Sequence, residues 1–373
     1  MSTRARPRST GLPVIGALTP LGQGASLIAL GLSLAAFGLN ALHANPSVVF
    51  VIAATAILGL AWIIGLATDR LGTVVGPHAG GILNATFGNV AELIIAFFAL
   101  QAGLIEVVKA SLTGSIIGNL LLVLGASVLL GGLRHGTQRF NQRVAGSNAA
   151  LLVVAAIGLF VPAIFAFSGG GRNEASLQEE SLIVAVLLIV GYVLALVWQF
   201  TNPDRALGGH GPAGGHAGHA WSMRTAIGVL ITAAALLAGA SEVLVGAIGP
   251  FIDSIGLSAF FVGIVLVPTI GNLAEHLVAV QLAAKDRMEF AMAVCFGSSL
   301  QVALFVAPIL VIAGALLGQP MDLVFTPLEV AAVAAAVGIS ALIALDGESN
   351  WLEGALLVLV YLILAGSFLE LRL

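Results

Sequence analysis

The chain has 373 residues, of which 59% are hydrophobic and 9% charged, and its mean hydropathy is +1.09. Soluble domains carry about 25% charged residues, so this composition excludes a water-soluble protein and predicts a polytopic membrane protein. The net charge of −4 without a block of basic residues argues against nucleic acid as a partner, and the single cysteine, Cys295, excludes an internal disulfide framework.

Apolar stretches long enough to cross a bilayer follow one another along the chain. A crossing needs about 20 residues. Such stretches lie near residues 24–43, 48–67, 79–101, 110–132, 146–167, 181–200, 224–247, 256–283, 289–317, 326–345 and 352–370. We therefore predict an all-α membrane protein with about 11 transmembrane helices.

The basic residues favour one orientation, because lysine and arginine accumulate in cytoplasmic loops. With a cytoplasmic N-terminus, the inner segments hold Arg4, Arg6, Arg8, Arg70, Arg134, Arg139, Arg143, Arg205, Arg224, Lys285 and Arg287, and the outer segments hold Lys109, Arg172 and Arg372. This bias predicts a cytoplasmic N-terminus, and the compact chain favours a prokaryotic plasma membrane.

Two short motifs occur twice at the same spacing. TFGNVAE at 86–92 matches TIGNLAE at 269–275, so that Thr86, Gly88, Asn89, Ala91 and Glu92 pair with Thr269, Gly271, Asn272, Ala274 and Glu275. The offset is 275 − 92 = 183, and GSIIGN at 114 and GSSLQV at 297 show the same offset, 297 − 114 = 183. Two motifs at one offset indicate an internal duplication.

The duplication predicts an inverted repeat. Glu92 lies in the third predicted helix and Glu275 in the eighth, so an odd number of crossings separates them and the two copies run in opposite directions. Secondary transporters with this plan bind their substrate near the midplane, where the repeats meet. We divide the chain into a basic segment with a leading helix (1–45), a first five-helix repeat (46–205), a cytoplasmic linker (206–222) and a second, inverted five-helix repeat (223–373).

The linker contains GGHGPAGGHAGH, with His210, His216 and His219. Its glycines predict a flexible connection, and a weak metal-sensing tract is the alternative.

The repeated motifs carry the chemistry of a cation site. Gly88 and Gly271 weaken a helix, and Pro268 removes a backbone donor, so carbonyl oxygens become available to a ligand. Glu92 and Glu275 would add carboxylates, Asn89 and Asn272 amide oxygens, and Thr86 and Thr269 hydroxyls. These are hard oxygen ligands, which suit Ca²⁺. A buried acid bonded to a neighbouring helix is the alternative for one glutamate, but two in a repeated context indicate function.

Two carboxylates in a site of low dielectric repel each other and lack solvation, and both effects favour the protonated forms. A divalent cation reverses that preference. Ca²⁺ and protons would therefore compete for one site, which is the requirement for antiport, and no cofactor is needed.

Several neighbouring polar residues would line the pathway or support the acids; they are Ser115, Asn119, Ser298 and Gln301. Ordinary polar contacts between helices are the alternative for these four. His276 would tune Glu275 or relay a proton, or it is a packed neutral imidazole. Glu242, in ASEVLVG, is a candidate second acid on an ion or proton path.

The stretches NATFGNVAELI and PTIGNLAEH resemble the two signature repeats of the calcium/proton antiporters, a branch of the calcium:cation antiporter superfamily. GSIIGNLLLVLG, GSSLQVALFVAP and DGESNWLEG also resemble that branch. The resemblance runs from about residue 48 to the C-terminus and implies one leading helix followed by two inverted five-helix bundles. It also implies that Glu92 and Glu275 bind the cation and carry protons. We therefore predict an antiporter that exports Ca²⁺ from the cytoplasm in exchange for H⁺ by alternating access.

Other functions are less well supported by the sequence. Exchange of Ca²⁺ for Na⁺ and transport of another divalent cation such as Mn²⁺ share the same motifs, and a cation channel is a remote alternative. An enzyme is not expected, because the chain has no HExxH motif and nothing orients Ser241 and His276 as nucleophile and base. Two features depart from the family: Asp69 stands where relatives often carry glutamate, and the connection between the two halves has Asp204 as its only acid where relatives often have an acidic stretch.

Overall fold

The computed structural model describes residues 20–169, 174–202 and 221–371. The basic segment before residue 20 and the histidine-containing tract 208–219 lie outside these ranges. The elements, in which η marks π-helical segments, are α1 (Pro20–Ala41), α2 (Pro46–Val75), α3 (Pro77–Phe87), α4 (Val90–Gln101), α5 (Ile105–Ile117), η2 (Gly118–Val123), α6 (Leu124–His135), β1 (Gln138–Arg139), α7 (Gln142–Phe167), α8 (Glu174–Thr201), α9 (Met223–Ile255), α10 (Ala259–Phe261), η3 (Val262–Leu266), α11 (Val267–Ala283), α12 (Met288–Gln301), η4 (Val302–Val306), α13 (Ala307–Leu317), α14 (Pro327–Asp346), β2 (Glu348–Ser349) and α15 (Trp351–Glu370).

The described ranges contain ten helical spans long and apolar enough to cross a membrane. The remaining crossing is made by α3 and α4 together, because α4 has only 12 residues and a short turn at Gly88–Asn89 joins the two helices. The prediction of about 11 transmembrane helices is therefore confirmed. Each predicted stretch falls on one crossing.

The duplication extends from the sequence motifs to helix geometry. The crossing built from α5, η2 and α6 covers residues 105–135, which an offset of 183 moves to 288–318, and α12, η4 and α13 cover 288–317. Each of the two crossings changes to a π-helical segment at the same point, just after the GS motif. π-helical segments occur often at functional sites. Five crossings separate the copies, so the two repeats run in opposite directions through the membrane.

A small clasp ties the two repeats together on one side of the bundle. β1 pairs with β2 antiparallel, with Gln138 opposite Ser349 and Arg139 opposite Glu348. The side chain of Gln138 also donates to the carbonyl of Ala283 at 3.0 Å and to Asp286 at 2.8 Å. The loops after α6, α11 and α14 therefore meet on the same face, which we call the clasp side.

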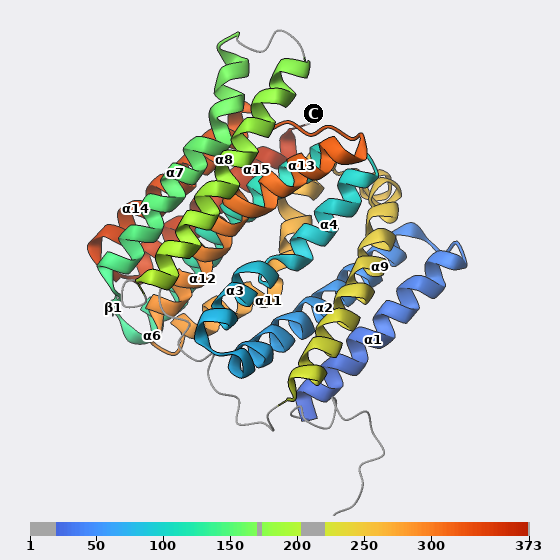
Figure 1. Ribbon diagram of the computed structural model, residues 1–373, viewed down its shortest axis with the longest axis horizontal. Coiled ribbons are helices and arrows are strands. Elements are labelled where there is room, and N and C mark those ends of the chain that lie inside the picture. Colours follow the sequence, from blue (N-terminus) through green and yellow to red (C-terminus); the bar gives the residue numbers. More distant parts are fainter. Residues whose placement is uncertain (1–19, 170–173, 203–220, 372–373) are drawn as a thin grey trace, which may run out of the picture.

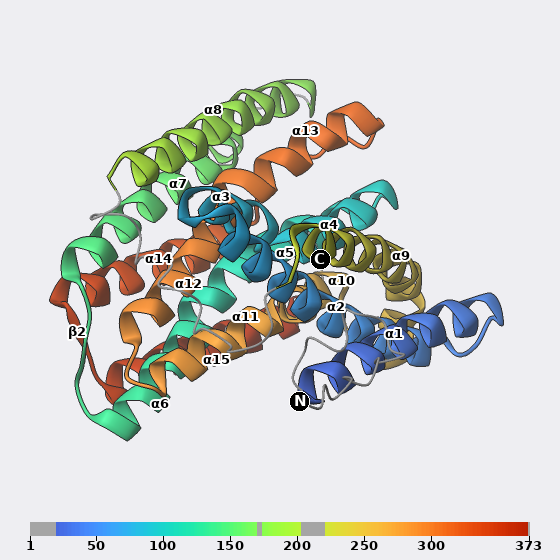
Figure 2. The ribbon, with the colours of Figure 1, turned by 60° about the horizontal axis from the view of Figure 1, so that its bottom comes forward.

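The helices form two flanks around a central group. α1, α2 and α9 lie side by side on one flank, and α7, α8 and α14 lie on the other, in both views (Figure 1 and Figure 2). The helices that carry the repeated motifs, α4, α5, α11 and α12, lie between these flanks. The fold thus brings the two motifs into the middle of the molecule.

Candidate ion-binding site

The two acidic motifs meet at the contact between α4 and α11. Glu92 lies in the first turn of α4, and Glu275 lies in the middle of α11. Glu92 lies against Gly271 of α11, and Glu275 lies in contact range of Gly88, between α3 and α4. The structure therefore brings together the two glutamates that the repeat singles out.

The backbone differs between the two motifs. The first motif interrupts its crossing, since α3 ends at Phe87 and α4 begins at Val90. The second motif stays helical through Gly271, and the irregular segment is η3, just before Pro268. Pro268 lies inside the continuous helical run Ala259–Ala283, just after η3, so its missing N–H falls where the helix changes from π- to α-helical. The expectation that both glycines loosen the backbone holds only for Gly88.

The glycine of the second motif permits close approach of the glutamate of the first. A Cβ atom built on Gly271 would lie 2.8 Å from Cγ of Glu92, which is closer than such atoms approach. A Cβ atom built on Gly88 would lie 2.8 Å from the carbonyl oxygen of Asn84 and 3.4 Å from Oε1 of Glu275, an ordinary contact distance. Gly271 therefore makes room for the acid of the other repeat, whereas Gly88 is limited by its own helix.

The two oxygens of Glu92 have different surroundings. Oε1 accepts hydrogen bonds from the hydroxyl of Ser115 and from the amide of Asn272. Oε2 is buried and has no hydrogen-bond partner among the described residues. Buried polar atoms are nearly always paired, so this oxygen has free lone pairs suited to a cation or a proton. The N-terminal end of α4 also favours negative charge at this position.

A chain of hydrogen bonds runs beside the acids. Ser298 donates to Oδ1 of Asn89 at 2.9 Å, and Nδ2 of Asn89 donates to Oε1 of Gln301 at 2.7 Å. Nδ2 of Asn119 donates to Ser298 at 3.0 Å, and Nε2 of His276 lies 3.1 Å from Oδ1 of Asn119. Since the oxygen of Asn119 can only accept, His276 carries its proton on Nε2 in this arrangement. The chain joins Asn89, which the sequence proposed as a ligand, to four residues proposed for the pathway or its support.

The remaining candidates lie at the edge of this arrangement or outside it. The hydroxyl of Thr269 donates to the carbonyl of Val265 at 2.6 Å, and Thr86 is exposed in the last turn of α3. Glu242 is exposed on α9 and is not part of the hydrogen-bond network around the acids.

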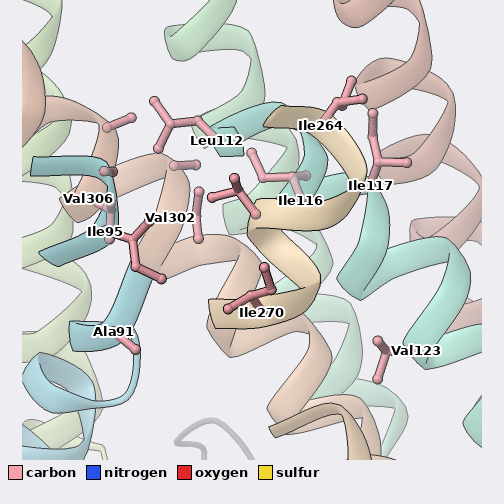
Figure 3. Packing of buried hydrophobic residues seen from close by; sticks show 14 of the residues in the cluster. Ala91, Ile95, Leu112, Ile116, Ile117, Val123, Ile264, Ile270, Val302 and Val306 are labelled. Atoms are coloured by element: carbon pink, nitrogen blue, oxygen red, sulfur yellow. The ribbon is translucent and has the colours of Figure 1, made fainter. Parts of the chain in front are cut away.

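A narrow cavity adjoins Glu92, and its lining includes Ser111 and Val302, which the sequence did not single out. Ser115 and Pro268, which it did, border the same cavity. Ser111 and Ser115 are four residues apart on α5 and share one face of the helix, which is the signal that could have identified Ser111. Apolar side chains frame this region, among them Leu112 and Val306 (Figure 3). Such walls keep the dielectric low and strengthen charge interactions at the acids.

Comparison with known proteins identifies related chains. The family model described as sodium/calcium exchanger protein matches residues 46–201 and 225–369. A Ca(2+)/H(+) antiporter of Synechocystis sp. (strain ATCC 27184 / PCC 6803 / Kazusa) is 44% identical over 339 residues, which are 87% of this chain and 91% of the relative. The Ca(2+)/H(+) antiporter ChaA of Bacillus subtilis (strain 168) is 40% identical over 352 residues, 92% of this chain and 97% of the relative. The solved structure of native YfkE has a TM-score of 0.80 and 36% identity, covering 93% of this chain and 100% of that chain.

Proposed function

Because this chain belongs to the sodium/calcium exchanger protein family, we propose that it is an antiporter that exchanges Ca²⁺ for H⁺ across a membrane. Two relatives that are 40% and 44% identical over most of their length are Ca(2+)/H(+) antiporters. The observation that carries the proposal is the buried Oε2 of Glu92, which has no partner among the described residues and lies where the two acidic motifs meet.

The exchange follows from competition for these oxygens. Glu92 and Glu275 bind Ca²⁺ in their ionised forms, with amide and hydroxyl oxygens nearby to complete an oxygen set of the kind that Ca²⁺ prefers. Protons neutralise the same carboxylates when the cation leaves, because two unpaired charges in an apolar site repel each other and lack solvation. Either loaded form is close to neutral and can change the side that it faces. The empty, doubly charged site changes sides poorly, which couples the two fluxes.

Two inverted repeats suit this cycle. The first repeat (46–205) and the second (223–373) meet at the acids, and a leading helix precedes them. Rocking of one group of helices against the other would expose the site to each side in turn.

The distribution of basic residues supports one orientation of the chain in the membrane. Arg134, Arg139, Arg143, Lys285 and Arg287 occupy loops and helix ends on the clasp side. Positive residues favour the cytoplasm, so we place the clasp side and the N-terminus on the cytoplasmic side of the membrane. Where the proton gradient is directed inward, proton entry would then drive Ca²⁺ out of the cell. A bacterial plasma membrane is consistent with the bacterial relatives.

A second candidate, Na⁺/Ca²⁺ exchange, is favoured by the description of the matching family. Measuring Ca²⁺ uptake by the purified protein in liposomes distinguishes Ca²⁺/H⁺ exchange from Na⁺/Ca²⁺ exchange. Under the proposal, an imposed pH gradient drives Ca²⁺ uptake and a Na⁺ gradient at constant pH does not, while Mn²⁺ in the same assay reports selectivity. Uptake that follows the Na⁺ gradient and ignores pH would reject proton coupling.

A further inference from the structure

A second cavity begins at the site and leads to a different helix. It shares Ser115 and Pro268 with the cavity beside Glu92, and its lining also includes Tyr361 of α15, Gly118 and His276. α15 packs against η2, the π-helical segment that begins at Gly118. The cavity is therefore lined both by Ser115, whose hydroxyl donates to Glu92, and by Tyr361, which lies outside both repeated motifs.

The side chain of Tyr361 is buried, and its hydroxyl lacks a hydrogen-bond partner among the described residues. The side chain is 9% exposed. A buried hydroxyl in an apolar membrane helix normally has a partner, because leaving it unpaired costs about 1–3 kcal/mol. A partner that is not protein, such as water in the cavity, accounts for this arrangement.

The other polar groups of the cavity have capacity for the same water. Ser115 donates its proton to Glu92 and can still accept a hydrogen bond, and Thr269 donates to Val265 and can still accept. His276 uses Nε2 toward Asn119, which leaves Nδ1 as an acceptor. The space admits about one water molecule, and a water with two to four polar partners is stable in a protein interior.

The cavity is unsuited to the metal ion. Ca²⁺ requires about six to eight oxygen ligands, whereas most of this wall is apolar, including Leu122 and Val265. Ile264 of η3 lies near Ile116 and Ile117 of α5 (Figure 3), where these two elements pack together. A proton can use a route of this kind and a hydrated divalent cation cannot.

We propose that this cavity is a proton branch, in which a water bound between Tyr361 and Ser115 delivers protons to Glu92 and removes them by a path that Ca²⁺ does not use. A proton arriving on the water moves to Oγ of Ser115 while the hydroxyl proton of Ser115 moves to Oε1 of Glu92. The water returns to its neutral form and Glu92 gains one proton; the reverse steps release it. The inference rests on the proposed function, and Tyr361 acts as a positioning residue for the water.

Glycine geometry supplies an independent way to block the branch. A Cβ built on Gly118 meets no atom within 4 Å, so alanine there adds a methyl group beside the cavity without a clash. At Gly114 the same methyl group would collide with the carbonyl of Ile264, so that position does not offer a clean test. Gly118→Ala should therefore narrow the cavity and leave the helix intact.

The test compares two fluxes in proteoliposomes: Ca²⁺ uptake driven by a pH gradient, and exchange of labelled for unlabelled Ca²⁺ at equal pH, which needs no proton movement. Tyr361→Phe should slow proton-driven uptake about tenfold, as expected when proton transfer loses one hydrogen bond, and should change Ca²⁺ self-exchange by less than about twofold. Gly118→Ala should act in the same direction. Replacing H₂O by D₂O should slow proton-driven uptake in the unmodified protein more than self-exchange.

Tyr192→Phe is the matched control, because Tyr192 is the other tyrosine of the chain and stacks on Phe305 at 5.1 Å in α8. It should alter neither flux. Equal loss of both fluxes in Tyr361→Phe, or full retention of both in Tyr361→Phe and Gly118→Ala, overturns the proton branch. Absence of proton-driven uptake in the unmodified protein rejects the proposed function itself, so the two failures are distinguishable.

Discussion

Gly271 of the second repeat lies directly against Glu92 of the first, so that a Cβ atom on Gly271 would come within 2.8 Å of Cγ of Glu92. Gly88 has no such clash with Glu275, whose Oε1 would lie at an ordinary contact distance of 3.4 Å from the added atom. Gly271 is thus part of the site geometry, because it sets the distance between Glu92 and the backbone of the opposite repeat.

Alanine at Gly271 should displace Glu92. The methyl group overlaps the glutamate side chain, and a shift of a few tenths of an ångström spoils contacts that Ca²⁺ needs at about 2.3–2.6 Å. We expect the apparent Ca²⁺ affinity of Gly271→Ala to fall at least about tenfold, or ~1.4 kcal/mol. Gly146→Ala in α7 is the control, since a Cβ there meets nothing within 4 Å. Calcium titration of both purified variants measures the effect, and unchanged affinity in Gly271→Ala would refute the packing argument.

Glutamine at Glu92 or Glu275 should abolish exchange and preserve the fold. The amide keeps the size of the side chain, and its oxygen can still accept the bonds from Ser115 and Asn272, but the negative charge is lost. Removing one charged partner from a buried site costs about 3–5 kcal/mol, so Ca²⁺ binding should weaken more than about 100-fold. Flux in liposomes checks activity, and thermal unfolding in detergent checks the fold. Exchange at the normal rate in both variants would remove the glutamates from the mechanism.

The crossings and the acid pair could be predicted from the sequence because each leaves a local signal. Long apolar stretches define the crossings, and TFGNVAE and TIGNLAE identify the acids through a common offset. Periodicity and repetition carry no information on which side chains approach across the interface. The bonds from Asn272 to Glu92 and from Asn89 to Gln301 link residues 180 and 212 positions apart, and only the packed structure defines them.

Residues outside the motifs were the least predictable. Lys109 contributed only to the count of basic residues, yet its ammonium lies 2.7 Å from Asp322 and 5.9 Å from the ring centroid of Phe325. Tyr361 gave no signal at all, since one tyrosine in an apolar helix is compatible with ordinary packing. The equivalent motifs also predicted the same backbone conformation in both repeats. In the structure a helix ends at Gly88, whereas Gly271 lies within α11.

Alanine at Asn272 should weaken the binding of Ca²⁺. Asn272→Ala removes a donor from the charged carboxylate of Glu92, and hydrogen bonds to charged groups contribute about 1.5–3 kcal/mol. We expect apparent Ca²⁺ affinity to fall about tenfold or more. Asn148→Ala, which removes an equally buried asparagine from α7, should leave the affinity unchanged. Equal affinities in Asn272→Ala and the unmodified protein would show that Glu92 needs no support from the opposite repeat.

Thr113 should matter for stability and not for ion selectivity. Its hydroxyl donates to Oε1 of Glu329 at 2.7 Å, and the other oxygen of Glu329 accepts from the backbone of Thr326 at 2.9 Å, at the start of α14. Thr113→Val keeps the shape and leaves a buried carboxylate oxygen unpaired, which costs about 1–3 kcal/mol. The melting temperature in detergent should fall while the preference for Ca²⁺ over Mn²⁺ stays the same. Thr232→Val, on an exposed face of α9, is the control and should not lower it. A stable Thr113→Val protein would contradict the structural role of this bond.

Binding of Ca²⁺ should release protons. The ion competes with protons for Glu92 and Glu275, so adding Ca²⁺ to the protein in weak buffer should acidify the solution, and the apparent affinity should drop as the pH falls, by up to about tenfold per pH unit for each proton displaced. Glu92→Gln and Glu275→Gln should each release fewer protons than the unmodified protein, since one exchanging carboxylate is missing. A pH indicator read during calcium titration measures the release. Binding without any release of protons, at a pH-independent affinity, would separate the ion from the proton and leave Na⁺ as the counter-ion to test.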